Sequence, residues 1–367
     1  MFLLLDAPNL GGAEKAKLME CVDSTYVSTA GPFVPEFEQR FARYLGTEDC
    51  VSVQSGTAAL HIALAEAGVG PGDEVIVPAL SFAASVNPIL YTGATPVLVD
   101  VDPETWTLDP ELAEAAVTPR TRAILPVHLY GNLCDMDKLG RIAEERGLVI
   151  IEDATESLGG TWKGKPSGTL GNFGCFSFNG NKLITTGGGG MVVARDRENL
   201  NHIRFLANQA RDASKGYFHP EMGYNYRMTN LEAALGLAQM ERIDLFLEKK
   251  AAFARIYREV LASLPEVEFQ KELPGAQSAW WLPSFTLSGG AVPELQEKLR
   301  EKGVPTRRLF SPLHTYPYLK DSCRFSYPHA ERIFEQGINI PASTVNDEES
   351  TLRAAEIIRD AVLSMRR

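Results

Sequence analysis

The sequence predicts an α/β fold in which a large domain with a mostly parallel, mixed sheet precedes a smaller α+β domain. Short apolar runs alternate with helical stretches between residues 50 and 195. Strands that are apolar nearly throughout and are separated by helices are typical of a parallel sheet covered on both faces. The 367 residues, of which 44% are hydrophobic, suffice for such a core and a second one.

The predicted elements follow one another in a regular order. The apolar runs are VSV at 51, EVIVP from Glu74, TPVLVD from Thr95, RAILPVHL from Arg122 and LVIIED from Leu148, with a helix from about Gly56 to Ala67. Residues 196–245 are expected to be helical and polar, and a long helix follows at about 245–264. The tail then alternates helix and short strand, which predicts a large domain at 1–245 and a small one at 246–367.

Composition excludes several classes of protein. The net charge of -11 opposes binding to nucleic acid phosphates, so we expect no nucleic acid partner. No apolar run is long enough to span a bilayer, and the N-terminus lacks the features of a signal peptide, so we expect no membrane association. Five scattered cysteines without a CxxC pair favour a reduced, cytoplasmic location.

A lysine followed by four glycines is the most unusual local feature. In SFNGNKLITTGGGGMVV, residues 177–193, Lys182 lies between a short aromatic strand and the glycines at 187–190. Consecutive glycines lose much entropy on folding, so they are expected where the backbone turns tightly or approaches a ligand closely. Taken alone, the motif is equally consistent with a glycine-rich hairpin that carries an exposed lysine.

Two further motifs stand at the ends of apolar runs. In LVIIEDATES the run ends in Glu152 and Asp153, and ligands of open α/β sheets bind beyond the carboxyl ends of strands. Capping of a helix is the alternative role for Asp153. In VQSGTAALHIAL, Ser55, Gly56 and Thr57 open a helix, whose free N–H groups and dipole favour an anion such as phosphate. Such turns are common and do not identify a ligand by themselves.

Together, the three motifs fit one ligand, pyridoxal 5′-phosphate (PLP). The helix start would bind the phosphate, Asp153 the ring nitrogen, and Lys182 the aldehyde as a Schiff base. A carboxylate beside that nitrogen favours its protonated form, and the protonated ring can accept electrons from the reacting carbon. No group of His, Cys and acidic residues has the spacing of metal ligands, so no metal is expected.

With these motifs the chain resembles the DegT/StrS-type nucleotide-sugar aminotransferases, which have fold type I of the PLP-dependent transferases. The resemblance covers nearly the whole length. It runs in order through SGTAAL, VPALSFAASVNPIL, IEDATES, FSFNGNK, GYNYRMTNLEAALGLAQ and PLHTYPY. It implies an enzyme with PLP as its cofactor.

The resemblance also implies which side chains contact the cofactor. Phe82 would stack on the ring, unless it is a core aromatic. Glu156 stands where relatives often carry Gln near the phenolic oxygen, and an acid would repel a phenolate there unless the two share a proton. The phosphate would be bound by the helix start and by the hydroxyl of Ser177. The expected cofactor-binding residues of the chain itself are Ser55, Gly56, Thr57, Phe82, Asp153, Glu156, Ser177 and Asn179.

A second subunit and a substrate pocket follow from the same resemblance. Asn225, in GYNYRM, would reach the phosphate of the neighbouring subunit's cofactor, which implies a homodimer with shared active sites; a turn asparagine is the alternative. Arg308, His314 and Tyr316 resemble the segment that lines the sugar-nucleotide pocket, where arginine suits a diphosphate. Solvated surface groups are the alternative for these three residues.

The implied reaction moves the amino group of L-glutamate to a nucleotide-linked keto sugar and leaves 2-oxoglutarate, with Lys182 transferring the proton. The form FSFNGNK followed by TTGGGG is most similar to enzymes that aminate C4 of UDP-linked 4-keto-6-deoxy-N-acetylhexosamines, on routes to bacillosamine or legionaminic acid. GDP-linked 4-keto-6-deoxymannose, which leads to perosamine, and a C3-keto sugar are alternatives. Relatives that dehydrate sugars carry histidine in place of this lysine.

Two other classes of protein are alternatives to an aminotransferase. A non-catalytic PLP-binding regulator would keep the fold, but the chain has no added DNA-binding segment and no basic patch. A nucleotide-binding dehydrogenase would need GxGxxG between its first strand and helix, and the glycine run at 187–190 lies far from there.

Overall fold

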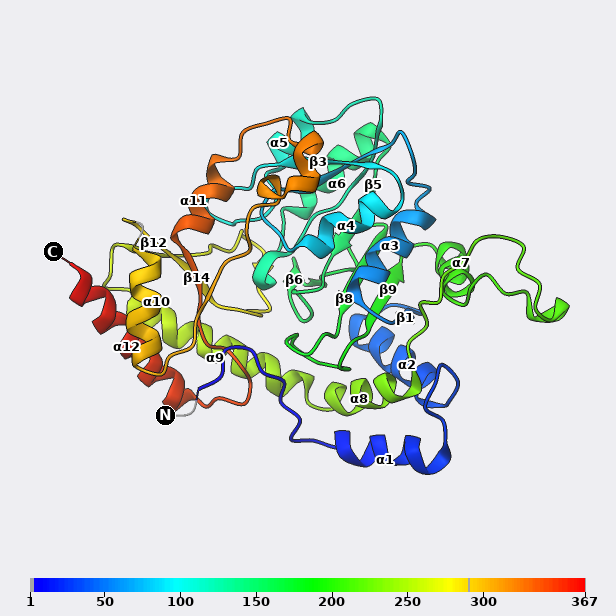
Figure 1. Cartoon of the computed structure of the whole chain (residues 1–367), viewed down its shortest axis with the longest axis horizontal. Helices are drawn as coiled ribbons and strands as arrows, with labels where there is room; N and C mark the ends of the chain where they lie inside the picture. Colours follow the sequence, from blue (N-terminus) through cyan, green and yellow to red (C-terminus); the bar gives the residue numbers. More distant parts are fainter. Residues whose placement is uncertain (1–2, 290, 367) are drawn as a thin grey trace.

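The computed structural model describes residues 3–289 and 291–366. Within them, the central sheet consists of β1 (Val51–Val53), β2 (Glu74–Pro78), β3 (Thr95–Val99), β4 (Thr121–Ile124), β5 (Val149–Asp153), β8 (Phe173–Ser177) and β9 (Gly190–Ala194). The strand order is β1-β9-β8-β5-β4-β2-β3. Figure 1 labels β1, β9, β8, β5 and β3 of this sheet. The five strands from β8 to β3 are parallel, whereas β9 is antiparallel to both of its neighbours. This arrangement confirms the predicted mixed, mostly parallel sheet.

Helices cover both faces of the central sheet. They are α1 (Glu14–Ser24), α2 (Phe33–Leu45), α3 (Gly56–Glu66), α4 (Ala83–Tyr91), α5 (Pro110–Ala115), α6 (Met136–Arg146), α7 (Arg197–Ala207) and α8 (Asn230–Met240). Because successive strand residues point to opposite faces, Cys175 packs with α3, α4 and α7, while Phe176 packs with α2 and α8. Farther along this second face, α5 and α6 cover the strands.

One predicted strand is shorter than expected. The apolar run RAILPVHL leads into β4, but the strand ends at Ile124. Pro126 follows two residues later, and proline cannot donate a hydrogen bond to a sheet. The other apolar runs of the large domain form strands where they were predicted.

The C-terminal part is built around a second sheet of order β10-β12-β14-β13. These strands are β10 (Val267–Phe269), β12 (Ser284–Leu287), β13 (Arg307–Arg308) and β14 (Gly337–Asn339). The helices of this part are α9 (Ile243–Leu261), α10 (Val292–Glu301), α11 (Pro328–Gln336) and α12 (Glu348–Met365). The long helix α9 runs from the central sheet to this part and packs against α12 there (Figure 1).

The expected domain boundary at residue 245 falls inside α9. A small third sheet also joins the two sides of that boundary, because β11 (Ala276–Gln277) pairs with β6 (Thr161–Trp162), which pairs in turn with β7 (Lys165–Pro166). The division at 245 therefore stays a prediction.

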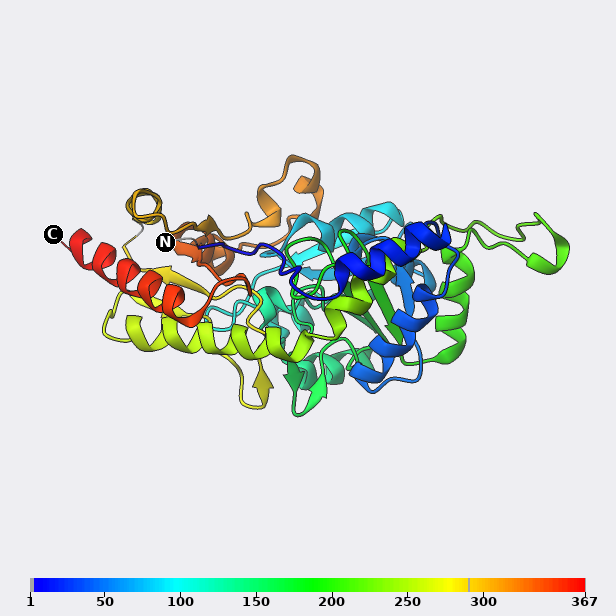
Figure 2. The same ribbon diagram turned by 90° about the horizontal axis from the view of Figure 1, so that it is seen from below.

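The N-terminal segment, residues 3–12, crosses from the C-terminal part to α1 (Figures 1 and 2). Leu3 lies in the core formed by α9, α10 and α12. Leu4 exchanges two hydrogen bonds with Asn346, of 2.9 and 2.7 Å. The segment thus contacts both parts of the chain although it precedes every strand.

A second irregular segment, residues 208–229, projects from the molecule beyond α7 (Figures 1 and 2). Its side chains Tyr217 and Met222 are 84% and 77% exposed. Among the helices of the described residues, none combines the length and the apolar character needed to cross a membrane.

Candidate active site

The carboxyl ends of several strands meet at one edge of the central sheet, beside a cavity of about 510 Å³. β1 leads to Ser55, while β5 ends at Asp153 and β8 at Ser177. Ligands of open α/β sheets bind at such an edge. Of the residues expected from the sequence, the cavity wall contains Ser55, Gly56, Thr57, Phe82, Asp153, Glu156, Ser177, Asn179, Lys182, Arg308 and Tyr316.

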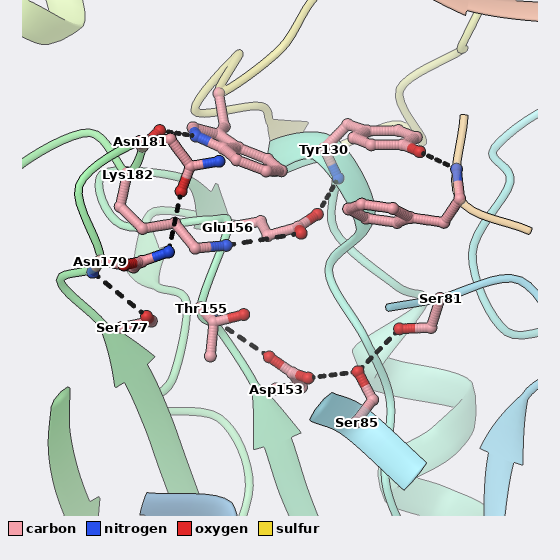
Figure 3. Close-up of polar contacts among 12 residues, drawn as sticks. Ser81, Ser85, Tyr130, Asp153, Thr155, Glu156, Ser177, Asn179, Asn181 and Lys182 are labelled. Carbon is pink, nitrogen blue, oxygen red and sulfur yellow. Dashed lines mark hydrogen bonds and ion pairs between the residues drawn. The ribbon is translucent and has the colours of Figure 1, made fainter. Parts of the chain in front are cut away.

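Lys182 points into this cavity and is largely covered. Its side chain is 14% exposed, and its Nζ lies 3.5 Å from Oε1 of Glu156 (Figure 3). The same Nζ lies 4.1 Å from the centre of the Trp281 ring, a distance typical of a cation–π contact. The indole N–H of Trp281 donates to the carbonyl of Asn181 at 2.7 Å, which fixes the ring beside the lysine. An exposed hairpin lysine, the alternative from the sequence, does not describe this side chain.

Of the two consecutive acids at the end of β5, Asp153 faces the cavity and Glu152 does not. Asp153 is 2% exposed, and its Oδ2 accepts a hydrogen bond of 2.7 Å from the hydroxyl of Ser85 (Figure 3). Glu152 points to the other face of the sheet, as the strand alternation requires. There it lies 2.9 Å from Nε2 of His128 and accepts from the backbone N–H of Gly168. The acidic pair therefore divides into one buried structural carboxylate and one at the cavity.

The first turn of α3 is open toward the cavity. Ser55 caps the helix, since its hydroxyl accepts from the N–H of Ala58 at 3.1 Å. Helix geometry leaves the N–H groups of Gly56 and Thr57 without acceptors inside the helix. A Cβ on Gly56 would lie 2.7 Å from the Cβ of Ser177, so only glycine lets this hydroxyl approach the helix start. These donors form one polar end of the cavity.

The glycine run forms a tight turn next to that helix start. Gly187 and Gly189 have φ values of +86° and +78°, which L side chains rarely adopt. A Cβ on Gly190 would lie 2.6 Å from the backbone of Ser55. The predicted tight turn is confirmed, and the glycines let the backbone approach the start of α3; a close approach to a ligand stays a prediction.

Glu156 is buried between Lys182 and the backbone of Tyr130. Its Oε2 accepts from the N–H of Tyr130 at 2.8 Å (Figure 3). Burial raises the pKa of Glu156 above its ordinary value, and the nearby Lys182 only partly opposes this effect. A raised pKa makes this carboxyl group better suited to share a proton with the phenolic oxygen of PLP, which is the role expected for Glu156.

The aromatic wall is accessible rather than part of the core. Phe82 is 54% exposed, and its ring centre lies 5.4 Å from that of Phe310. Tyr316 also contributes to the wall. The reading of Phe82 as a core aromatic is therefore excluded for this chain, while stacking on a cofactor stays a prediction.

Arg308 lies in the wall, but its charged end points away. Residues 307 and 308 are consecutive in β13 and project to opposite faces. The Nη2 of Arg308 donates to the carbonyl of Phe334 at 2.6 Å, and the guanidinium stands 4.7 Å from the centre of the Phe334 ring. The structure thus turns Arg307, not Arg308, toward the cavity.

His314 and Asn225 lie outside the cavity wall. The ring of His314 stacks on Tyr327 at 4.5 Å, and its Nε2 lies 3.0 Å from Oε1 of Glu331. These contacts do not bring His314 to the expected substrate pocket. Asn225 is exposed and forms an isolated bridge with Asn208, so its predicted contact with a second subunit is not tested by one chain.

The cavity also contains residues that were not anticipated from the sequence, among them Ser85, Trp281 and Arg307. Ser85 follows Phe82 by one helical turn, and this spacing is a signal that could have found it. Trp281 and Arg307 come from the C-terminal part, about a hundred residues after Lys182, and no local pattern marks them.

The donor set fits PLP. Backbone N–H groups and the hydroxyl of Ser177 suit a phosphate, Asp153 suits a protonated ring nitrogen, and Lys182 suits the aldehyde. Within residues 3–289 and 291–366, no group of three or more His, Cys, Asp or Glu side chains is placed to hold a metal ion.

Known proteins resemble this chain over nearly its whole length. A sequence model of the DegT/DnrJ/EryC1/StrS aminotransferase family matches residues 8–359. The GDP-perosamine synthase of Caulobacter vibrioides is 42% identical over 339 residues, which are 91% of either chain. The GDP-perosamine synthase of Escherichia coli O157:H7 is 41% identical over 96% of either chain. The solved PLP form of Spr1654 from Streptococcus pneumoniae superposes with a TM-score of 0.92, at 29% identity, over 99% of either chain.

Proposed function

Because the chain belongs to the DegT/DnrJ/EryC1/StrS aminotransferase family, we propose that it moves the amino group of L-glutamate to C4 of GDP-linked 4-keto-6-deoxymannose. The chain is a PLP-dependent sugar aminotransferase with fold type I. The observation that carries the reaction is the meeting of Lys182, Asp153 and the start of α3 at one cavity. The choice of nucleotide rests on the two GDP-perosamine synthases, which are 42% and 41% identical to the chain.

Each of the main polar residues of the cavity has a separate role in the proposed reaction. When bound, PLP supplies an electron sink for the carbon that loses or gains the amino group. Asp153 holds the proton of the ring nitrogen by its opposite charge, and Lys182 carries the proton to and from the reacting carbon. Ser177 and the first turn of α3 bind the phosphate. Glu156 lies beside Lys182, and burial raises its pKa above the ordinary value, which favours sharing a proton with the phenolic oxygen of PLP.

A homodimer completes the proposal. Asn225 is exposed within the projecting segment, residues 208–229, where a second copy is accessible to it. A side chain that reaches the partner's cofactor phosphate from there would make each cavity depend on both chains.

A UDP-linked 4-keto-6-deoxy-N-acetylhexosamine is the second candidate substrate. The FSFNGNK motif with the following TTGGGG supports it. The names of the relatives support the GDP-linked sugar instead. We therefore place the GDP-linked sugar first, although the sequence motif alone favours the UDP-linked sugar.

One experiment tests both candidates. The PLP-loaded protein is incubated with L-glutamate, and its visible absorption is followed until the cofactor has taken up the amino group. GDP-4-keto-6-deoxymannose or UDP-4-keto-6-deoxy-N-acetylhexosamine is then added, and the sugar nucleotide is analysed by mass spectrometry. The expected result is an amino sugar and a restored spectrum with the GDP-linked substrate.

Each outcome separates the candidates. Restoration by the UDP-linked sugar alone would support the motif over the relatives' names. Restoration by neither sugar would overturn the C4 proposal while leaving the glutamate half-reaction. No spectral change with glutamate would favour a non-catalytic PLP-binding protein.

A further inference from the structure

We propose that Asp6 is a positioning residue: it holds Arg307 toward the cavity, where this arginine binds an anionic group of a substrate. The proposal rests on the proposed function, since that function brings two anionic substrates to this cavity. Asp6 belongs to the N-terminal segment, residues 3–12, and none of the motifs of the sequence includes it.

Arg307 is the arginine of β13 whose guanidinium is not held by the contacts with Phe334 that hold Arg308. It lies in the wall, and its side chain is 38% exposed. Its Nη2 donates to Oδ2 of Asp6 at 2.9 Å. Its Nε is buried without a hydrogen-bond partner among the described residues, as is the Nε of Arg308, so this atom does not distinguish the two arginines. A buried donor without a partner costs free energy, and an anion beside the guanidinium would satisfy donors of this group.

The carboxylate of Asp6 also binds the loop that carries the lysine. The side-chain amide of Asn181 donates to the same Oδ2 at 3.2 Å. Asn181 precedes Lys182, and its carbonyl accepts the indole N–H of Trp281. One carboxylate therefore connects β13, the lysine loop and the N-terminal segment. Its side chain is only 17% exposed, so water screens these contacts less than at an open surface.

Asp6 has a fixed place because its segment is anchored on both sides. Leu4 pairs with Asn346, and the amide of Asn9 donates to the carbonyl of Thr344 at 2.9 Å. Oδ1 of Asn9 accepts from Arg242 at 3.0 Å. The carbonyls of Leu5 and Ala7, on either side of Asp6, accept from Ala342 and Ser343, so the loss of the Asn9 side chain alone leaves both neighbours of Asp6 anchored.

A fixed partner matters for a long side chain. Ordering a free arginine costs rotamer entropy, and a neighbouring carboxylate that already orders the side chain removes this cost from ligand binding. Guanidinium groups recognise carboxylates and phosphates with the same pair of N–H donors. The anionic group is therefore either a carboxylate of the amino donor or the diphosphate of the sugar nucleotide.

The test uses the PLP-loaded protein and isothermal titration calorimetry. The probes are 2-oxoglutarate, which carries the carboxylates, and GDP, which carries the diphosphate. The variants are Arg307→Ala, Asp6→Ala and Asp6→Asn, and Asn9→Ala is the matched control in the same segment. Steady-state kinetics of each variant give KM and kcat for both substrates.

We expect Arg307→Ala to weaken one probe by about tenfold or more. Asp6→Ala should weaken the same probe by about three- to tenfold, and Asp6→Asn, which keeps an acceptor oxygen, should lie nearer to the unchanged protein. Asn9→Ala should stay within about twofold. KM should rise for the matching substrate while kcat changes little, because only a binding contact is lost. Loss of 2-oxoglutarate binding identifies a carboxylate, and loss of GDP binding identifies a diphosphate.

Three results would overturn the proposal: binding of neither probe to the unchanged protein, no effect of Arg307→Ala on either probe, or equal effects of Asp6→Ala and Asn9→Ala. The calorimetric titrations with 2-oxoglutarate and GDP do not depend on turnover. An unchanged protein that binds a probe but transfers no amino group would refute the proposed function and still decide the role of Asp6.

Discussion

The two walls of the cavity are held in different ways. Asp153 and Ser177 end adjacent parallel strands, so the pairing of the backbone places them. Trp281 and Arg307 come from the C-terminal part, where β13 places the backbone of Arg307, but contacts with Asn181 and Asp6 hold the indole and the guanidinium. A wall placed by the register of a sheet should keep its shape when one side chain changes. A wall placed by single side-chain contacts should not.

Lys182→Ala removes the reacting amine from the first wall and should have the largest effect. We expect kcat to fall by roughly 10⁴-fold or more, with loss of the visible absorption of lysine-bound cofactor. The melting temperature without cofactor should change little, because the sheet holds this wall. Lys163→Ala, at an exposed lysine paired with Asp137, is the control. Retained turnover in Lys182→Ala would refute the assignment of the lysine.

Asp153→Asn tests the charge of the same wall without removing its hydrogen bond from Ser85. We expect kcat to fall by about 10²- to 10³-fold, because a neutral amide no longer holds the proton of the ring nitrogen. Binding of PLP, measured by fluorescence titration, should persist. Ser85→Ala should reduce kcat much less. An unchanged kcat in Asp153→Asn would place the essential carboxylate elsewhere.

Lys250→Met tests a contact of the second wall, because Lys250 bonds to Trp281; the quantity compared is the pH dependence of stability. Lys250 is buried, and its Nζ donates to the carbonyl of Trp281 at 2.7 Å. Burial lowers the pKa of Lys250 from 10.5 to about 7, so between these values the unfolded chain binds more protons and stability rises with pH. The charge thus costs stability at low pH, and Lys250→Met removes this cost.

The measurement for Lys250→Met is urea unfolding at several pH values. The stability of the variant relative to the unchanged protein should be greatest below pH 7 and should fall by about 2 kcal/mol between pH 7 and pH 9. Lys302→Met, at an exposed position, should show no such trend. A difference that is independent of pH would mean that Lys250 is not charged differently in the two states.

Arg308→Ala should have the smallest effect on activity. It allows a comparison of the two neighbouring arginines of β13, Arg307 and Arg308. It removes the contact with Phe334, so we expect a loss of about 1 kcal/mol in unfolding free energy. KM for both substrates should stay within about twofold, in contrast to Arg307→Ala. A tenfold rise in KM for the sugar nucleotide would return the substrate role to Arg308.

The first wall was predictable because each of its parts ends a strand. The motifs at Ser55, Asp153 and Ser177 are continuous with apolar runs, and parallel strands bring their carboxyl ends to one edge. The orientation of Arg308 and His314 was not predictable. It depends on packing against Phe334 and Tyr327, which local sequence does not encode.

The sequence by itself determined the class of fold and the cofactor, and it predicted the lysine that would bind this cofactor, because hydrophobic periodicity and strand-end motifs extend over only a few residues. Tertiary structure alone decided that Asp6, Arg307 and Trp281 meet the lysine loop. These residues are separated by up to about three hundred positions, and only the packing of the N-terminal segment and the C-terminal sheet brings them together. Local sequence patterns indicate which residues are buried and where the chain turns. The contacts between distant side chains depend instead on the whole folded core.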